Sequence, residues 1–199
     1  FKAADLLDKA DKGDIVSQKI FRIMTPLIKF RACRDVRKVA GDAMEIRGGL
    51  GYIEDWLDPK ILRDSHLGSI WEGTSNIISL DTIRALKKDN NIHIFKNFLI
   101  DSVKNVSIKK HEKYLLSAIE KVFNFIESEI KDDFTSSSRQ ITSSLYYLGS
   151  AIFLTEEGNY CEDLSYRSKI SELVLKYKID KNSPITRDDI DFGLIKELI

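Results

Sequence analysis

The chain has 199 residues, of which 43% are hydrophobic, and its 31 basic residues balance its 31 acidic ones. A chain of this size and composition can bury a sizeable core, which excludes intrinsic disorder. The balanced charge gives no support for binding to nucleic acid or to an anionic membrane, and no apolar run is long enough to span a bilayer. Cys33 and Cys161 lie far apart without metal-ligand spacing. We therefore expect a reducing, cytoplasmic location and no metal.

The chain opens directly on a helical pattern. Phe1 leads into an amphipathic run without an initiator methionine or a signal sequence, so we expect a fragment of a longer protein. In the range Ile15–Ile46, apolar residues recur every three or four positions. This spacing predicts one long amphipathic helix, with a kink or a restart near Thr25 because Pro26 follows.

The same helix carries a basic stripe, formed by Arg31, Arg34, Arg37 and Lys38. Such a stripe can be a solvated or ion-paired face, or it can follow a row of phosphates. Because Asp35 and Asp42 are interspersed, the pattern favours an ion-paired or solvated face.

A glycine-rich turn ends the long helical pattern, with glycines at Gly48, Gly49 and Gly51. Glycine allows positive φ or close approach of the backbone to a ligand. A plain helix C-cap accounts for most such turns, and residue types alone favour it. The second glycine, Gly49, is the one that a cap does not explain.

A short helix is expected next, over Lys60–Leu67, because Pro59 is typical of a first helical turn. We expect Arg63 and Asp64 to pair with groups across the preceding loop. His66 has no second ligand nearby, so a packing or hydrogen-bonding role is favoured over metal binding.

Glu72 lies at a break between two helical patterns, after Trp71 and before Gly73. A carboxylate beside an indole tends to be desolvated, which raises its pKa toward the range that suits a general base. The alternative is a helix cap, since Thr74 is an N-cap type and acids favour helix N-termini. On residue types alone the cap is favoured.

The helical pattern resumes after Ser75 and is interrupted by a polar run at residues 87–91, where we place a boundary between a domain at 1–88 and an extension at 89–199. Beyond it, amphipathic periodicity predicts further helices over 92–106, 109–131, 136–152, 166–177 and 187–199. The predicted fold is all-α, an up-down helical bundle with an appended C-terminal helical segment.

Three motifs within residues 21–86 carry a family resemblance. They are the Gly-Gly-x-Gly-Tyr turn at 48–52, Leu-Arg-Asp at 62–64, and Trp-Glu-Gly-Thr followed by Ser-Asn at 71–76. In this order and spacing they resemble the C-terminal domain of the flavin-dependent acyl-CoA dehydrogenases. The last motif is most similar in form to the larger bacterial, AidB-like branch, which carries extra helices after the shared domain. The resemblance implies a C-terminal portion of a bacterial cytoplasmic enzyme, inactive by itself.

The resemblance implies that Glu72 is the catalytic base, which removes the α-proton of an acyl-CoA while a hydride leaves the β-carbon for flavin N5. It places Gly73 and Arg84 on the substrate side. Thr74 and Asn76 correspond to positions that contact FAD. The remaining cofactor positions, where the FAD pyrophosphate of a neighbouring subunit is contacted, are Glu45 (Gln in many relatives), Gly48 and Gly49.

The implied partners are an acyl-CoA substrate, an electron-transfer flavoprotein or another acceptor, and further copies of the chain in a dimer or tetramer. Nucleic acid is not expected, because residues 87–199 carry 17 basic residues (31 minus 14) and 18 acidic ones (31 minus 13). Two alternatives stay open. One is an AidB-like flavoprotein with a binding or protective, DNA-associated role and little turnover, and the other is a purely structural helical module.

Overall fold

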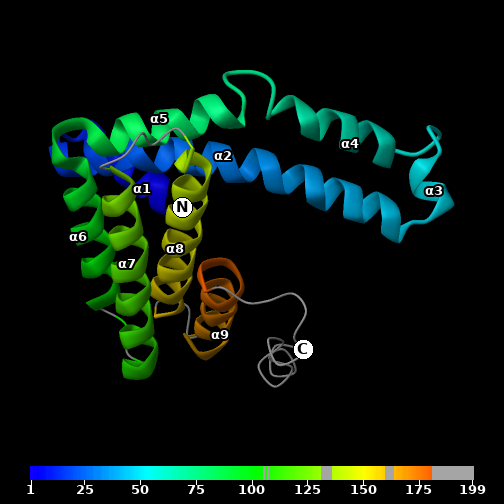
Figure 1. Cartoon of the computed structure of the whole chain (residues 1–199). Coiled ribbons are helices and arrows are strands. Elements are labelled where there is room, and N and C mark those ends of the chain that lie inside the picture. The colour runs from blue at the N-terminus through cyan, green and yellow to red at the C-terminus, as the bar shows by residue number, and fades with distance from the viewer. Residues whose placement is uncertain (105, 107, 131–135, 160–163, 181–199) are drawn as a thin grey trace.

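The computed structural model describes residues 1–104, 106, 108–130, 136–159 and 164–180 (Figure 1). These ranges contain helices and turns and no strand, which confirms the all-α prediction. The elements are α1 (Lys2–Asp11), α2 (Ile15–Ile46), α3 (Gly49–Tyr52), α4 (Asp58–Leu67), α5 (Ser75–Lys87), a 3₁₀ turn η1 (Lys88–Asn90), α6 (Asn91–Lys104), α7 (Lys109–Ile130), α8 (Ser138–Gly158), α9 (Leu164–Val174) and a π-helical turn η2 (Leu175–Ile179).

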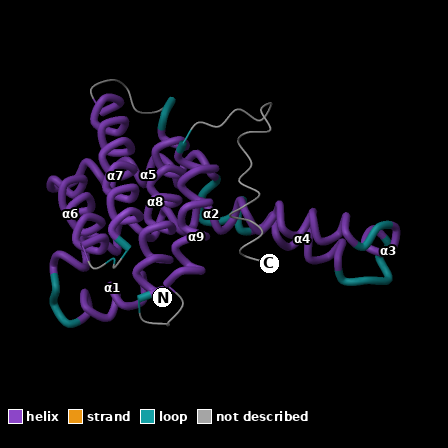
Figure 2. Tube along the Cα trace, turned by 90° about the horizontal axis from the view of Figure 1, so that it is seen from below, coloured by secondary structure: helices purple, strands orange, loops and turns teal. Residues whose placement is uncertain are grey.

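The molecule has two visibly different parts (Figures 1 and 2). The first half of α2 and helices α1 and α5 to α9 gather into a bundle, in which α6, α7 and α8 run crosswise to α2 and α5. The second half of α2 projects from the bundle together with α3, α4 and the turns on either side of α4, and we call this part the arm (residues 33–74). A Cβ at Gly68 would lie 3.0 Å from the Cys33 sulfur, so this glycine allows α4 to end close against α2.

The core of the bundle is one cluster of buried apolar side chains. Leu86 of α5, Phe95 of α6 and Leu145 of α8 are each at most 1% exposed and belong to this cluster. Burying such a side chain contributes about 1.5–3 kcal/mol to stability. The cluster therefore joins residues on both sides of the boundary predicted near residue 88, and that boundary stays a prediction.

Helix α2 runs through Pro26 as a single helix of 32 residues, so a restart near Thr25 is wrong, while the alternative of a kink there stays a prediction. Proline removes one backbone donor and clashes with the preceding turn, which favours a break. Here the Thr25 hydroxyl donates to the Phe21 carbonyl oxygen at 2.9 Å, and Ile23, Pro26 and Leu27 are buried against neighbouring helices. Packing on both sides of the proline keeps the helix continuous.

The helices predicted after residue 91 correspond to α6, α7 and α8, and the segment predicted at 166–177 is found as α9 and η2. The segment predicted at 187–199 and Cys161 lie outside the described residues. None of the helices in the described ranges is both long and apolar enough to cross a membrane.

Candidate functional site

The glycine turn lies at the tip of the arm, between α2 and α3 (Figure 1). Gly48 has φ 59° and ψ −140°, a backbone conformation that residues other than glycine rarely adopt. A Cβ at Gly51 would lie 2.1 Å from the Met44 carbonyl oxygen, so this position has no room for a side chain. Gly49 has neither constraint, since a Cβ there would meet nothing within 4 Å. The Gly49 backbone is therefore accessible at the surface. A glycine that served only to cap the helix would not need this accessibility.

An ion pair connects the loop between α3 and α4 to helix α4, and a second ion pair lies within α4. Arg63 donates two hydrogen bonds to the Glu54 carboxylate, at 2.6 and 3.1 Å, as the sequence predicts for a pair across this loop. The hydrogen bond from Arg63 holds the pKa of Glu54 below its usual value. Asp64 instead pairs with Lys60 one turn earlier on α4, so the cross-loop pairing predicted for Asp64 is wrong. Residues four apart on a helix are neighbours, which makes Lys60 the nearer partner.

His66 is exposed on the last turn of α4, so a packing role is wrong for it, and the alternative of a hydrogen-bonding role stays a prediction. The His66 ring lies on the solvent-facing side of α4. Among the described residues, no group of three or more His, Cys, Asp or Glu side chains is arranged to hold a metal ion.

Glu72 lies in the turn between α4 and α5 with a backbone φ of 56°, and Gly73 follows with φ 109°. A residue other than glycine at positive φ costs about 1–3 kcal/mol and is concentrated at functional sites. The Glu72 side chain is 79% exposed, and one carboxylate oxygen lies 3.6 Å from the Lys29 ammonium of α2. The desolvation predicted for Glu72 is absent within this chain, because Trp71 is itself 57% exposed.

The capping interpretation of this turn is not supported either. Thr74 is the N-cap residue of α5 by its backbone angles, yet its side chain makes no capping hydrogen bond. The Thr74 and Asn76 side chains are exposed at the start of α5, next to Glu72. Polar side chains at this helix end are therefore available to a ligand.

The structure separates the candidate residues into two groups. Glu72, Gly73, Thr74 and Asn76 lie where the arm meets the bundle, while Glu45, Gly48 and Gly49 lie at its tip, and Arg84 is exposed further along α5. Between Lys29, beside Glu72, and Ile46 at the end of α2 are 17 helical steps, or about 26 Å. The two groups therefore do not converge on one point within this chain.

The arm exposes many large apolar side chains: Val36, Val39, Ile46, Leu50, Tyr52, Ile53, Trp56, Leu57, Ile61, Leu67, Ile70 and Trp71. Soluble monomers rarely expose so many large apolar side chains over one short segment, and large exposed apolar patches mark contact surfaces.

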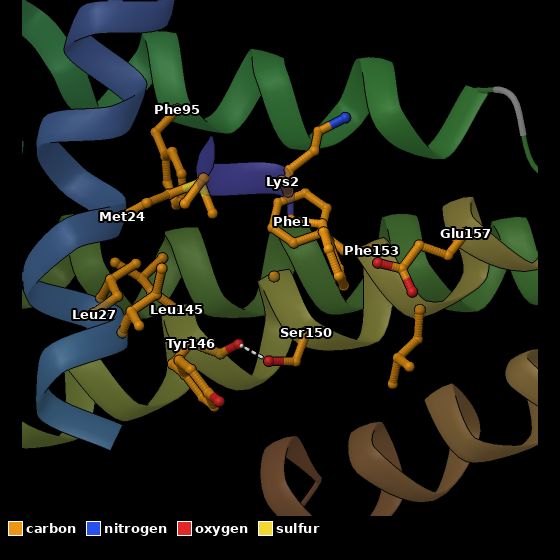
Figure 3. Close-up of a pocket in the computed structure, with 14 residues that line it drawn as sticks. Phe1, Lys2, Met24, Leu27, Phe95, Leu145, Tyr146, Ser150, Phe153 and Glu157 are labelled. Carbon is orange, nitrogen blue, oxygen red and sulfur yellow. Dashed lines mark hydrogen bonds between the residues drawn. The ribbon is translucent and has the colours of Figure 1, made fainter. Parts of the chain in front are cut away.

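A cavity of about 440 Å³ opens between α1, α2, α6 and α8, away from the arm (Figure 3). Its wall is mostly apolar, with Met24, Leu27, Phe95 and Phe153 among the lining residues. Sequence reasoning missed this cavity and the contact of Lys29 with Glu72. No local sequence pattern predicts the cavity or this contact, because each depends on which helices pack together.

Comparison with known proteins agrees with this fold. The family model "Acyl-CoA dehydrogenase, C-terminal domain" matches residues 1–87. The fold and this match define the class that the chain resembles: residues 1–87 are similar to the C-terminal domain of the acyl-CoA dehydrogenases, and further helices follow them.

Individual relatives are similar to longer parts of the chain. AidB of Escherichia coli (strain K12) is 30% identical over 128 residues, which cover 64% of this chain and 22% of AidB. Acyl-CoA dehydrogenase family member 11 of Caenorhabditis elegans is 38% identical over 94 residues, which cover 46% of this chain and 15% of the relative. The chain thus matches about a fifth or less of each relative's length.

A solved structure has the same fold over nearly the whole chain. The crystal structure of Caenorhabditis elegans ACDH-11 in complex with C11-CoA superimposes with a TM-score of 0.77 and covers 99% of this chain and 35% of that one. At 24% identity this likeness shows the fold alone. It extends past residue 87, so the additional helices also have a counterpart there.

Proposed function

We propose that the chain acts as the C-terminal part of an FAD-dependent acyl-CoA dehydrogenase that removes two hydrogens from the α and β carbons of an acyl-CoA thioester, with Glu72 as the base. The observation that carries the proposal is the positive-φ pair Glu72 and Gly73. This turn leaves the Glu72 carboxylate exposed, 3.6 Å from the Lys29 ammonium and beside the start of α5, which has no side-chain cap. Support also comes from the family match over residues 1–87.

Each residue then has a chemical task. The Glu72 carboxylate accepts the α-proton, and the Lys29 ammonium lies 3.6 Å from it. The Glu72 backbone N–H donates to the thioester carbonyl oxygen, where negative charge develops. Gly73 leaves the backbone open beside the substrate, and Arg84, exposed on α5, faces the CoA side.

Two of the residues proposed to hold FAD, Gly49 and Thr74, fit that group. The Gly49 backbone has open space around it, which a phosphate needs for close approach, and the Thr74 hydroxyl is not used in a cap. FAD, when bound, accepts the hydride from the β-carbon. Thr74 and Asn76 would contact it from the bundle end of the arm, and Glu45, Gly48 and Gly49 from the tip.

Because tip and base are about 26 Å apart along α2, we propose that they serve two different FAD molecules in a homodimer or homotetramer. The exposed apolar side chains of the arm support this arrangement, since a neighbouring subunit would cover them. Covering the arm would also desolvate Glu72. Reoxidation would require an electron-transfer flavoprotein or another acceptor.

The test uses the complete protein that contains this chain, purified with its flavin. Anaerobic addition of acyl-CoA thioesters of different chain lengths should bleach the visible flavin absorbance, and Glu72→Gln should slow bleaching about 10²–10⁴-fold while flavin stays bound. Glu127→Gln, which changes an exposed carboxylate of α7, is the matched control and should bleach normally. Normal bleaching by Glu72→Gln would remove Glu72 from the role of base.

A second candidate function is an AidB-like flavoprotein with a binding or protective role and little turnover. The observation that favours it is the 128-residue match with AidB, which is longer than the 87-residue family domain. A protein that holds flavin but is not bleached by any thioester in the same experiment would support this candidate over the dehydrogenase.

A further inference from the structure

Four arginines lie where α2 passes the first turn of α8, and we call them the arginine cluster: Arg31, Arg34 and Arg37 of α2, and Arg139 of α8. The hydroxyls of Ser79 and Ser138 are 3.2 Å apart, which anchors the first turn of α8 against α5. The Arg31 guanidinium lies 4.8 Å from the centre of the Tyr147 ring, two turns further along α8. The cluster thus combines a helix from residues 1–87 with a helix from the extension.

Most of the positive charge in the cluster has no acidic partner. Arg31 pairs with Asp35, and Arg34 lies over the Phe30 ring at 5.4 Å. Arg34, Arg37 and Arg139 make no salt bridge with another described residue. The ion-paired face predicted for this stripe is confirmed for Arg31, and the neighbouring Lys38 pairs with Asp42.

Two further observations show that the cluster concentrates positive charge and hydrogen-bond donors. The Nε atoms of Arg31 and Arg37 are buried without a hydrogen-bond acceptor, which is costly for a charged donor. Burial, and then the charges of Arg31, Arg139 and Arg37, lower the pKa of Arg34. Lys178 adds another cation, 5.6 Å from the centre of the Tyr147 ring. Like charges held together in this way repel one another unless an anion lies between them.

The guanidinium group is planar and presents paired N–H donors, a geometry that matches the oxygens of phosphate groups. The N-terminal end of α8 adds the positive end of a helix dipole of 21 residues. We propose that the arginine cluster binds a small anion that carries two or more phosphate groups. A small ligand fits better than nucleic acid, because the chain has no net charge and the arm beside the cluster carries Asp42 and Glu45. The cluster does not include Glu72, and the proposal does not depend on the proposed flavin chemistry.

Inorganic pyrophosphate is the probe, titrated into the 199-residue chain by calorimetry at constant ionic strength. We expect saturable binding that raises the thermal midpoint of the protein. Arg34→Gln and Arg139→Gln should each weaken the affinity for pyrophosphate at least tenfold, because each removes charge-assisted hydrogen bonds. Arg63→Gln, which removes an exposed, ion-paired arginine of the arm, is the matched control and should bind with unchanged affinity.

The ligand-free variants provide a second readout. If the cluster is an anion site, Arg34→Gln relieves repulsion and its thermal midpoint without ligand should equal or exceed that of the parent chain. A lower midpoint together with unchanged pyrophosphate affinity would assign Arg34 a structural role and overturn the proposal. The proposal would also be overturned if pyrophosphate binding to the parent chain did not saturate. The same holds if Arg63→Gln weakened pyrophosphate binding as much as Arg34→Gln does. Binding of duplex DNA through the same arginines, without binding of pyrophosphate, would replace the small ligand with nucleic acid.

Discussion

The Lys29 ammonium lies 3.6 Å from the Glu72 carboxylate, although the two residues are 43 positions apart in the chain. Lys29 is 22% exposed on α2, whereas Glu72 is 79% exposed on its strained turn. The less exposed cation therefore positions the more exposed acid. This contact joins the long helix of the arm to the residue that we propose as the base.

Removing this cation should have a small effect on the proposed reaction. Exposed ion pairs contribute about 0.2–1 kcal/mol, so Lys29→Met should lower the rate of flavin bleaching in the complete protein by about 1.4- to 5-fold. Lys60→Met, which breaks an exposed pair on α4, is the control and should leave the rate unchanged. A loss as large as that of Glu72→Gln would mean that Lys29 contacts the substrate itself.

The glycines of the arm tip should differ in their tolerance of a side chain. Gly51→Ala would place a Cβ 2.1 Å from the Met44 carbonyl oxygen, and overpacking of this kind costs about 1–3 kcal/mol. Gly49→Ala meets nothing within 4 Å and should leave the stability of the chain unchanged, while weakening FAD binding in the complete protein. Urea unfolding measures the first effect and flavin content the second. Equal stability of the two variants would contradict this geometry.

The shared core predicts that the bundle unfolds as one unit. Leu86 is 1% exposed on α5, before the predicted domain boundary, and contributes to the same cluster as Phe95 and Leu145 beyond it. Leu86→Ala should lower the free energy of unfolding by about 2–5 kcal/mol and keep a single transition. Helical signal and near-ultraviolet signal, recorded in urea, should fall together. Two separate transitions would instead show that residues 1–88 and 89–199 fold independently.

A buried histidine should make stability depend on pH. His111 Nε2 of α7 lies 3.0 Å from both Thr155 Oγ1 of α8 and Ser171 Oγ of α9, and burial lowers the pKa of His111. The unfolded chain, with a pKa near 6.5, therefore takes up the proton at higher pH than the folded one. Stability contributed by neutral His111 is fully present above pH 6.5 and falls as the pH decreases below that value.

Unfolding free energies measured from pH 7.5 down to pH 5 check this direction. His111→Gln should reduce the decrease on acidification, because it removes the buried titrating group while keeping a polar side chain. His93→Gln changes an exposed histidine of α6 and should follow the parent chain. An identical pH dependence in the parent chain and in His111→Gln would contradict the assignment.

The sequence by itself determined the helices and the position of the candidate site in the chain. Amphipathic periodicity is a local property, so α2, α4, α6 and α7 begin and end within a few residues of the predicted ranges. The motif around Glu72 and the glycine turn are also local, and the family match covers both.

Only the tertiary structure decided how these parts meet. The continuity of α2 through Pro26, the exposure of Glu72 and its contact with Lys29 depend on how neighbouring helices pack. The electrostatic interaction of Arg34 on α2 with Arg139 on α8 has the same origin. Residues far apart in the chain have no periodicity in common, because the packing of whole helices, and not the local pattern, sets the distances between them.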